Sequence, residues 1–141
     1  MTPVKQTFGK KEKLKSKITL ERTFTQGQKI KAYPIIARHT ESSHSGDFPF
    51  QVATTVSKRK FRKAVSRNRI KRLMREAWRL QKHKIESLWV SGDAKEALIF
   101  LYIGNHIPTF EECMNNIGKI VDVLVDRLNK IEGEKQKGKG A

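Results

Sequence analysis

Residues 57–82, SKRKFRKAVSRNRIKRLMREAWRLQK, contain the pattern that decides the fold. Apolar side chains recur in this stretch at intervals of three and four residues, which is the period of an amphipathic helix. The same stretch holds 12 Lys and Arg residues and a single acid, Glu76. We therefore predict a helix over residues 64–84 that packs its apolar side on a sheet and presents cations on its other side.

The two faces of this helix separate cleanly. The apolar face holds Ile70, Leu73, Met74, Ala77 and Trp78. The opposite face holds Asn68, Lys71, Arg72, Arg75, Arg79 and Lys82. A solvated helix face usually mixes both signs of charge, whereas most of these cations have no acidic neighbour at helical spacing. Such a face is typical of a surface that binds a polyanion, because Arg forks meet phosphate oxygens and released counterions favour binding.

The basicity of the chain is concentrated in this stretch. The 141 residues carry a formal charge of +16, yet outside residues 57–82 there are 18 Lys and Arg against 13 Asp and Glu. A field this positive attracts polyanions. Nucleic acid is the first candidate, and an anionic membrane is disfavoured because the sheet needs the apolar face of the helix. We expect one domain over residues 16–132, after a basic arm (1–15) and before a disordered basic tail (133–141).

The segment before the basic helix predicts a short helix and the first strands. Residues 16–26 predict a helix that ends at Gly27 in a left-handed conformation. Residues 29–39 predict one strand interrupted at Pro34 or two short strands, because proline cannot donate to a ladder. Residues 50–57 alternate two kinds of side chain and predict a further strand.

The segment after the basic helix predicts a strand and a helix. Residues 97–103 form a nearly unbroken apolar run, which is typical of a central strand. Thr109 and Glu112 stand at capping-box spacing before a long apolar stripe with steps of three and four. We therefore predict a long final helix that lies on the sheet.

The chain shows few groups for chemistry of its own. The single Cys113 excludes an internal disulfide and fits a reducing compartment, where we expect it to be a small buried hydrophobe. The four histidines have no metal-ligand spacing and are interpreted as incidental, while Trp78 and Trp89 are interpreted as packing residues. No catalytic residue is assigned, and metal ligands remain unknown. Without a signal peptide or an apolar run of spanning length, a cytoplasmic protein is expected.

Four short motifs carry a family resemblance: VSKR at residues 56–59, AV at 64–65, RNRIKRL at 67–73 and REA at 75–77. Together they resemble the protein component of bacterial ribonuclease P, and the resemblance extends more loosely over residues 14–128. It implies an α+β fold, a single two-layer sandwich in the order α-β-β-β-α-β-α. It also implies a four-stranded mixed sheet with a left-handed βαβ crossover, of the ribosomal protein S5 domain 2-like type, against the usual right-handed rule.

In that family the protein is a non-catalytic cofactor of a catalytic RNA that removes the 5′ leader from precursor tRNA, and the resemblance implies the same role here. The implied partners are ribonuclease P RNA and the precursor tRNA leader, with divalent metal (Mg) in the holoenzyme and no obligate protein partner. The implied RNA-subunit-binding residues are Arg62, Lys63, Arg67, Asn68, Arg69, Lys71, Arg72, Arg75 and Arg79. The leader-binding candidates are Phe24, Tyr33, Val52, Thr54, Val56, Lys58 and Lys60.

Two details depart from the family pattern, and one alternative function stays open. The turn over residues 57–65 lacks the glycine that many members have, and Ala53 stands where a strand glycine is common. Val52, Thr54 and Val56 floor a leader cleft only if no helix covers their face. The alternative is a free-standing RNA-binding or ribosomal protein, which would share the basic helix without needing a leader cleft.

Overall fold

The structure, a computed structural model, describes residues 13–14, 16–41, 50–86 and 95–139. Its elements are α1 (Lys17–Gln26), β1 (Gln28–Ala32), β2 (Ile35–Glu41), β3 (Phe50–Val56), α2 (Ala64–Gln81), α3 (His83–Glu86), β4 (Glu96–Tyr102) and α4 (Phe110–Lys139). The predicted α+β order is confirmed, with the four-residue α3 added after α2. The predictions for most of the arm and for Trp89 lie outside the described residues.

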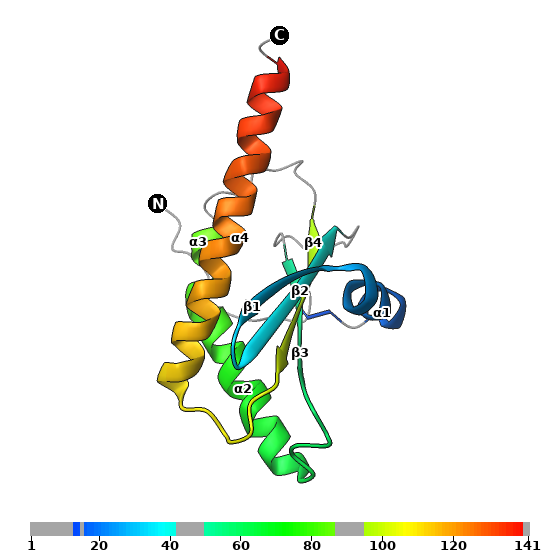
Figure 1. Ribbon diagram of the computed structural model, residues 1–141, viewed down its shortest axis with the longest axis vertical. Helices are drawn as coiled ribbons and strands as arrows, with labels where there is room; N and C mark the ends of the chain where they lie inside the picture. Colours follow the sequence, from blue (N-terminus) through cyan, green and yellow to red (C-terminus); the bar gives the residue numbers. More distant parts are fainter. Residues whose placement is uncertain (1–12, 15, 42–49, 87–94, 140–141) are drawn as a thin grey trace.

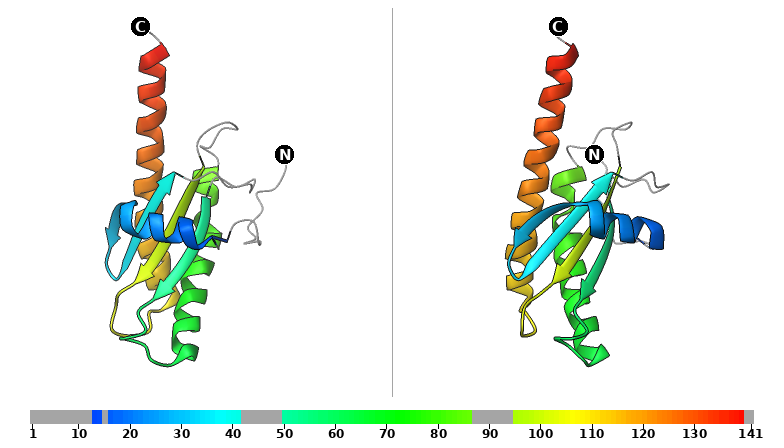
Figure 2. Two further views of the ribbon diagram at one scale, coloured as in Figure 1. Left: turned by 90° about the vertical axis from the view of Figure 1, so that its right-hand side faces the viewer. Right: turned by 45° about the vertical axis from the view of Figure 1, so that its right-hand side comes forward.

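The four strands form one mixed sheet in the order β1-β2-β4-β3. β1, β2 and β4 pair antiparallel, whereas β3 runs parallel to β4. The β3–α2–β4 connection therefore joins two neighbouring parallel strands. Seen from the α2 side of the sheet with β3 pointing up, β4 lies to the left of β3, so the crossover is left-handed as expected (Figure 2).

Helices cover the two faces of the sheet unequally. α2 and α4 lie side by side on one face, and α1 crosses the other (Figures 1 and 2). β4 lies inside the sheet with Ala97, Leu98, Ile99 and Phe100 all buried, which confirms the prediction of a central strand. Alternate residues of β4 enter two separate cores, because successive side chains of a strand point to opposite faces.

The main core lies between the sheet and the α2–α4 pair. Trp78 of α2 is fully buried, and its ring centroid lies 5.9 Å from that of Phe50 and 5.6 Å from that of Phe100, which confirms the packing role predicted for it. Gln81 joins the two helices by donating from Nε2 to the Met114 carbonyl at 3.0 Å. Gly118 of α4 permits this approach, since a Cβ there would lie 2.8 Å from the Gln81 side-chain oxygen.

α1 begins and ends with identifiable caps. The Thr19 amide donates to Ser16 Oγ at 3.4 Å, as expected for a serine N-cap. The left-handed conformation predicted for Gly27 is wrong, because its φ of −69° and ψ of 151° are extended. Glycine is needed there for space instead: a Cβ would lie 2.3 Å from the Thr23 carbonyl oxygen.

Both ends of the domain differ from the predicted boundaries. Leu14, assigned to the arm, is 5% exposed and donates its amide to the Val52 carbonyl at 2.9 Å, so this part of the arm belongs to the fold. α4 continues through residue 139, past the sheet (Figure 1), instead of giving way to the predicted disordered tail. The prediction is wrong over 133–139, because the Glu, Lys and Gln residues that surround Gly133 are good helix formers.

The start of α4 confirms the predicted capping box. The Glu112 amide donates to Thr109 Oγ1 at 3.1 Å, and the Thr109 amide donates to Glu112 Oε2 at 3.4 Å. Two backbone donors at the helix start are thereby satisfied. None of the helices in the described ranges is long and apolar enough to cross a membrane.

Candidate nucleic-acid interface

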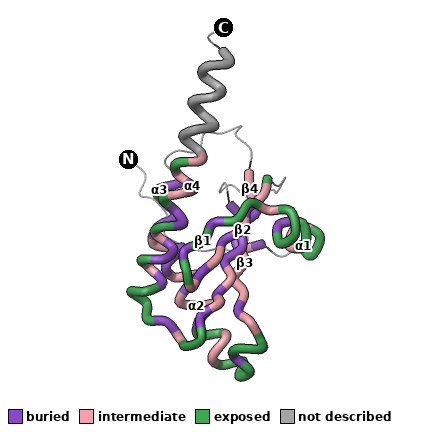
Figure 3. The backbone as a smooth tube through the Cα atoms, in the orientation of Figure 1, coloured by how far each residue is buried: buried purple, intermediate pink, exposed green. Residues whose placement is uncertain are grey.

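The cationic side of α2 faces away from the sheet. Asn68, Arg69 and Arg72 are exposed, while Lys71, Arg75 and Arg79 are half-buried. The apolar side of the same helix is fully buried at Ile70, Met74, Ala77 and Trp78. The predicted separation of the two faces is therefore present, and Figure 3 shows the exposed residues gathered where α2 begins.

The N-terminus of α2 has an unusual chemical setting. Its N-cap residue is Lys63, which makes no side-chain cap hydrogen bond, and the first turn contains no acid. Helix N-termini normally attract Ser, Thr, Asp or Glu, because the first amides and the helix dipole are electropositive. Here the N-cap residue is itself a cation and the first turn holds no acid, so neither reduces the positive potential of the helix start. Such a start fits a phosphate group.

The connection from β3 to α2 adds five exposed cations: Lys58, Arg59, Lys60, Arg62 and Lys63. Lys60 donates to the Ile103 carbonyl at 2.5 Å, which ties this connection to the one that follows β4. Residues 57–63 and the first turns of α2 thus form one continuous positive surface, which we name the basic end. It gathers all the predicted RNA-subunit-binding residues except Arg75 and Arg79, which lie further along the same helix.

Arg67 differs from the other cations of the motif. Its Nη1 donates to the Phe61 carbonyl at 2.7 Å and to the Arg62 carbonyl at 2.8 Å. The guanidinium therefore fixes the path of residues 61–63 before the helix begins. This contact positions the basic end, whereas Arg69 and Arg72 expose their side chains to solvent and are open to a ligand.

Arg79 and Lys82 differ from the rest of the predicted cationic row, because one is paired with an acid and the other is buried. Arg79 pairs with Glu76, with Nε 3.1 Å from Oε2, and its hydrogen bond lowers the pKa of Glu76 below the ordinary value. Lys82 is only 2% exposed, so its place on the exposed row is wrong. The reason is that α2 ends at Gln81, and Lys82 is the C-cap where the chain turns into α3.

A second candidate surface is the sheet face that α1 crosses, here called the α1 face. Strand register places Lys31, Ile36, Leu101 and Thr55 in one row across all four strands. The last three are half-buried and Lys31 is exposed, so this row combines an apolar floor with a cation at its edge. A neighbouring row pairs Lys29 directly with Arg38, a like-charge pair that is unfavourable by itself.

The structure corrects the leader candidates on β3. Val52 and Val56 are 2% and 5% exposed in the main core, and Thr54 shares their side of the strand. That side lies beneath α2 and α4, so these three residues do not floor a cleft beside α1. The opposite side of β3 carries Gln51, Ala53 and Thr55, all half-buried. The more apolar set of an alternating strand belongs in the larger core, which is the signal that favours this assignment.

The two aromatic leader candidates lie in different places. Phe24 is 43% exposed on α1, beside the α1 face. Tyr33 is 69% exposed in the β1–β2 turn, where it lines a cavity of about 310 Å³ with Gly104, Asn105, His106, Glu112 and Asn116. We name this cavity the α4 cavity. Glu112 and Asn116, which come from α4, were not among the predicted site residues.

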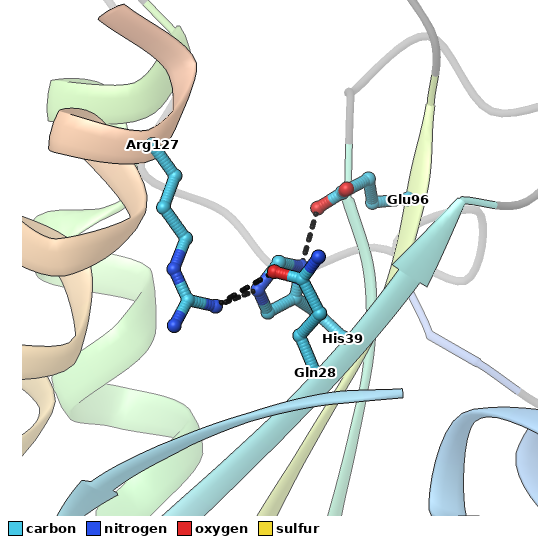
Figure 4. A network of polar contacts seen from close by, with 4 residues as sticks. All are labelled: Gln28, His39, Glu96 and Arg127. Carbon is cyan, nitrogen blue, oxygen red and sulfur yellow. Dashed lines mark hydrogen bonds and ion pairs between the residues drawn. The ribbon is translucent and has the colours of Figure 1, made fainter. Parts of the chain in front are cut away.

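His39 is not incidental, because it is buried at the centre of a polar network (Figure 4). Its Nε2 lies 2.6 Å from Arg127 Nη1, and its Nδ1 lies 3.0 Å from Glu96 Oε2. Arg127 also donates to Gln28 Oε1 at 3.1 Å. Arginine can only donate, so Nε2 accepts and the imidazole proton is on Nδ1, donated to Glu96. The network joins β1, β2, β4 and α4 and leaves neither ring nitrogen for chemistry.

Other reactive groups in the described part of the chain have structural settings. Burial raises the pKa of the Cys113 thiol to about 11, which confirms a buried, unreactive cysteine. Burial also raises the pKa of Tyr102 to about 12, and its hydroxyl donates to the His106 carbonyl at 2.5 Å. Within the described ranges, no group of three or more His, Cys, Asp or Glu residues is arranged to hold a metal ion.

Comparison with known proteins places the chain in a family. The family described as Ribonuclease P matches residues 8–121. The ribonuclease P protein component of Porphyromonas gingivalis is 32% identical over 107 residues, which cover 74% of this chain and 77% of that protein. The same component of Chlorobaculum tepidum is 33% identical over 124 residues, covering 81% and 80%.

Solved structures agree with the fold. The RNase P protein of Staphylococcus aureus superposes with a TM-score of 0.61 at 18% identity, covering 80% of this chain and 94% of that one. Fold and surface together define a small basic α+β protein whose crossover helix presents exposed cations. The chain belongs to the ribonuclease P protein family.

Proposed function

We propose that this protein is the non-catalytic protein subunit of ribonuclease P, acting with a catalytic RNA to remove the 5′ leader from precursor tRNA in the cytoplasm. Family membership supports the assignment. The observation that carries it is the basic end, where an uncapped helix start is surrounded by exposed cations. Like charges at this density oppose folding, and a bound polyanion removes that cost.

The basic end docks on the RNA subunit. The first amides of α2 and the exposed Arg62, Arg69 and Arg72 contact phosphates, and Arg67 holds the 61–63 segment in the conformation that presents them. Lys71, Arg75 and Arg79 extend the contact along the helix. Because the helix is fixed to the sheet through Trp78, the cations are presented without a large ordering cost on binding.

The α1 face receives the leader. Ile36 and Leu101 supply apolar surface for unpaired bases, and Phe24 supplies an aromatic ring for stacking. Lys29 and Arg38, which oppose each other across β1 and β2, and Lys58 at the end of β3 contact leader phosphates. Of the leader-binding candidates predicted from the sequence, this set keeps Phe24 and Lys58 and replaces Val52, Thr54 and Val56.

Cleavage belongs to the RNA, which is where the divalent metal of the holoenzyme is held. The protein contributes binding and orientation: it neutralises phosphate repulsion and keeps the leader extended. Both ring nitrogens of His39 are engaged within the fold, so this residue is not available as an acid or base.

Reconstitution tests the assignment. The protein added to its ribonuclease P RNA at limiting magnesium is expected to restore cleavage of precursor tRNA. A variant with Asn68, Arg69 and Arg72 changed to Ala should bind the RNA subunit about tenfold more weakly or worse, because several phosphate contacts are lost. Binding to the RNA without any stimulation of cleavage would instead favour the free-standing RNA-binding protein.

The leader surface has a separate test. Phe24→Ala should reduce the preference for precursor over mature tRNA by roughly fivefold or more, because one stacked base is lost. Ile18→Ala is the matched control, since Ile18 is 80% exposed on the same helix but lies on another side of it. Equal losses for precursor and mature tRNA would show that Phe24 is not a leader contact.

A further inference from the structure

The α4 cavity is lined by a polar side chain, Asn116, whose amide is not engaged by neighbouring groups among the described residues. Asn116 is 9% exposed, and no hydrogen bond joins its amide to another group in the part of the chain that the structure describes. An amide that is not engaged within the protein can both donate to and accept from a bound molecule. Asn116 lines the α4 cavity, so its amide is available to a molecule that enters there.

The walls of the cavity are fixed. The Ile103 amide donates to the Pro34 carbonyl at 2.8 Å, which joins the connection after β4 to the β1–β2 turn. Tyr102 holds the same connection through the His106 carbonyl. Glu112 is held by its capping box with Thr109, in which only Oε2 is engaged. The cavity is therefore formed before any ligand binds.

The chemistry of the walls selects a neutral planar ligand. Tyr33 offers an exposed ring at the cavity edge, and Asn116 offers both a donor and an acceptor. The Glu112 carboxylate repels phosphate and accepts hydrogen bonds. A cavity of about 310 Å³ lies at the lower end of the range for small-molecule sites, which suits a single base.

The cavity also lies next to the basic end. Lys60 reaches the carbonyl of Ile103, and the Phe61 ring lies 6.0 Å from the Tyr102 ring between centroids. An RNA strand held by the basic end therefore passes within reach of the cavity mouth. A base that leaves its stack there would meet an aromatic ring and a hydrogen-bonding edge, which is how unpaired RNA bases are recognised.

From these observations we propose that the α4 cavity binds one unpaired nucleobase of an RNA partner, stacked on Tyr33 and read by Asn116 and Glu112, with guanine preferred. Guanine presents two adjacent N–H donors on its Watson–Crick edge, which match the two oxygens of a carboxylate. This inference rests on the proposed function only in requiring that the partner is RNA.

Two RNA heptamers test the proposal: one of uridines only, and one with a single central guanosine. Both carry the same phosphates, so the ratio of their affinities reports the base and not the basic end. The full-length protein should prefer the guanosine heptamer about tenfold. Tyr33→Ala and Asn116→Leu should abolish the preference while leaving affinity for the uridine heptamer within about twofold.

Glu112→Gln is a further variant that should fold normally, because Gln also completes a capping box. It should keep the stability of the protein and lose the guanosine preference. Arg69→Ala should weaken both heptamers equally and keep the ratio. Equal affinity of the unchanged protein for both heptamers, or a preference that survives Asn116→Leu, would overturn the base assignment. Failure to bind either heptamer would overturn the RNA-binding function itself.

The base can come from the RNA subunit or from the leader. Binding measurements with the components of the holoenzyme distinguish these two sources. Tyr33→Ala should weaken binding of the RNA subunit if that subunit supplies the base. It should weaken binding of precursor tRNA, but not mature tRNA, if the leader supplies the base. No loss in either measurement would contradict a role for the cavity in this complex.

Discussion

At the scale of single residues, the two arginines that flank Asn68 have different tasks. Arg67 donates to two backbone carbonyls and shapes the basic end, while Arg69 is exposed. Arg67→Ala should therefore lower the free energy of unfolding by about 1–3 kcal/mol, since charge-assisted hydrogen bonds are lost. Arg69→Ala should leave stability within about 0.5 kcal/mol and weaken RNA binding. Thermal denaturation measures the stability of the two variants, and RNA titration measures their affinity. Equal destabilisation by both substitutions would contradict different tasks for Arg67 and Arg69.

Cys113 gives a prediction about pH. Its folded pKa of about 11 lies above its ordinary value of 9.0, so the folded state keeps the thiol proton that the unfolded state loses between these values. Stability from this group is complete below pH 9 and is lost as pH rises toward 11. At pH 8 the folded thiol should react with a disulfide reagent about a hundredfold more slowly than the unfolded thiol, or slower still because it is buried.

A matched variant isolates the contribution of the thiol. Cys113→Ala should flatten the part of the stability curve between pH 9 and 11, and the remaining slope above pH 10 should come from groups such as Tyr102. Rapid labelling of the native protein at pH 8 would show that the thiol is not protected.

Sequence reasoning succeeded for residues whose partners are close in the chain. The Thr109–Glu112 capping box and the apolar side of the basic helix were predictable, because both depend on spacings of three or four residues. His39 and Asn116 were not recognised, because their surroundings come from segments up to 88 residues away. The exposed or buried state of a polar residue depends on such long-range packing.

At the scale of elements, the alternation of β3 was predicted but its direction was not. Val52 and Val56 face α2 and α4, and Ala53 faces α1. The more apolar set of an alternating strand favours the larger core, but the sequence of β3 does not show which face of the sheet carries that core. Register with β4 decides between the two faces, since Val52 pairs with Leu98 and Ala53 pairs with Ile99.

The polar network of His39 fastens α4 to three strands. Arg127→Met should lower the free energy of unfolding by about 1–3 kcal/mol, because the buried His39 Nε2 then has no donor. His39→Phe combined with Arg127→Met should recover part of the loss, since both polar partners are removed together. Lys119→Met, at an exposed position of α4, is the control and should change stability by less than about 0.5 kcal/mol. Additive losses in the double variant would contradict the pairing.

At the scale of the whole molecule, the sheet topology brings distant segments to one end. The connections after β3 and β4 and the turn between β1 and β2 meet there, joined by the Lys60–Ile103 and Ile103–Pro34 hydrogen bonds. Because β3 and β4 are parallel neighbours, both connections leave the sheet at the same edge. The basic end and the α4 cavity are therefore adjacent, although neither the spacing of charges nor the apolar periodicity indicates this.

The concentration of charge at this end predicts how RNA binding depends on salt. For single-stranded or duplex RNA regions, the logarithm of affinity should fall with the logarithm of salt concentration by about 0.7–0.9 for each phosphate neutralised. Changing Arg69 and Arg72 to Ala should therefore reduce the steepness by roughly 1.4–1.8. Changing Lys17 and Lys119 to Ala removes the same charge from exposed positions on α1 and α4. Titrations of the RNA subunit at several salt concentrations should show an unchanged slope for this control pair. Equal changes of slope for both pairs would mean that binding follows net charge and not the geometry of the basic end.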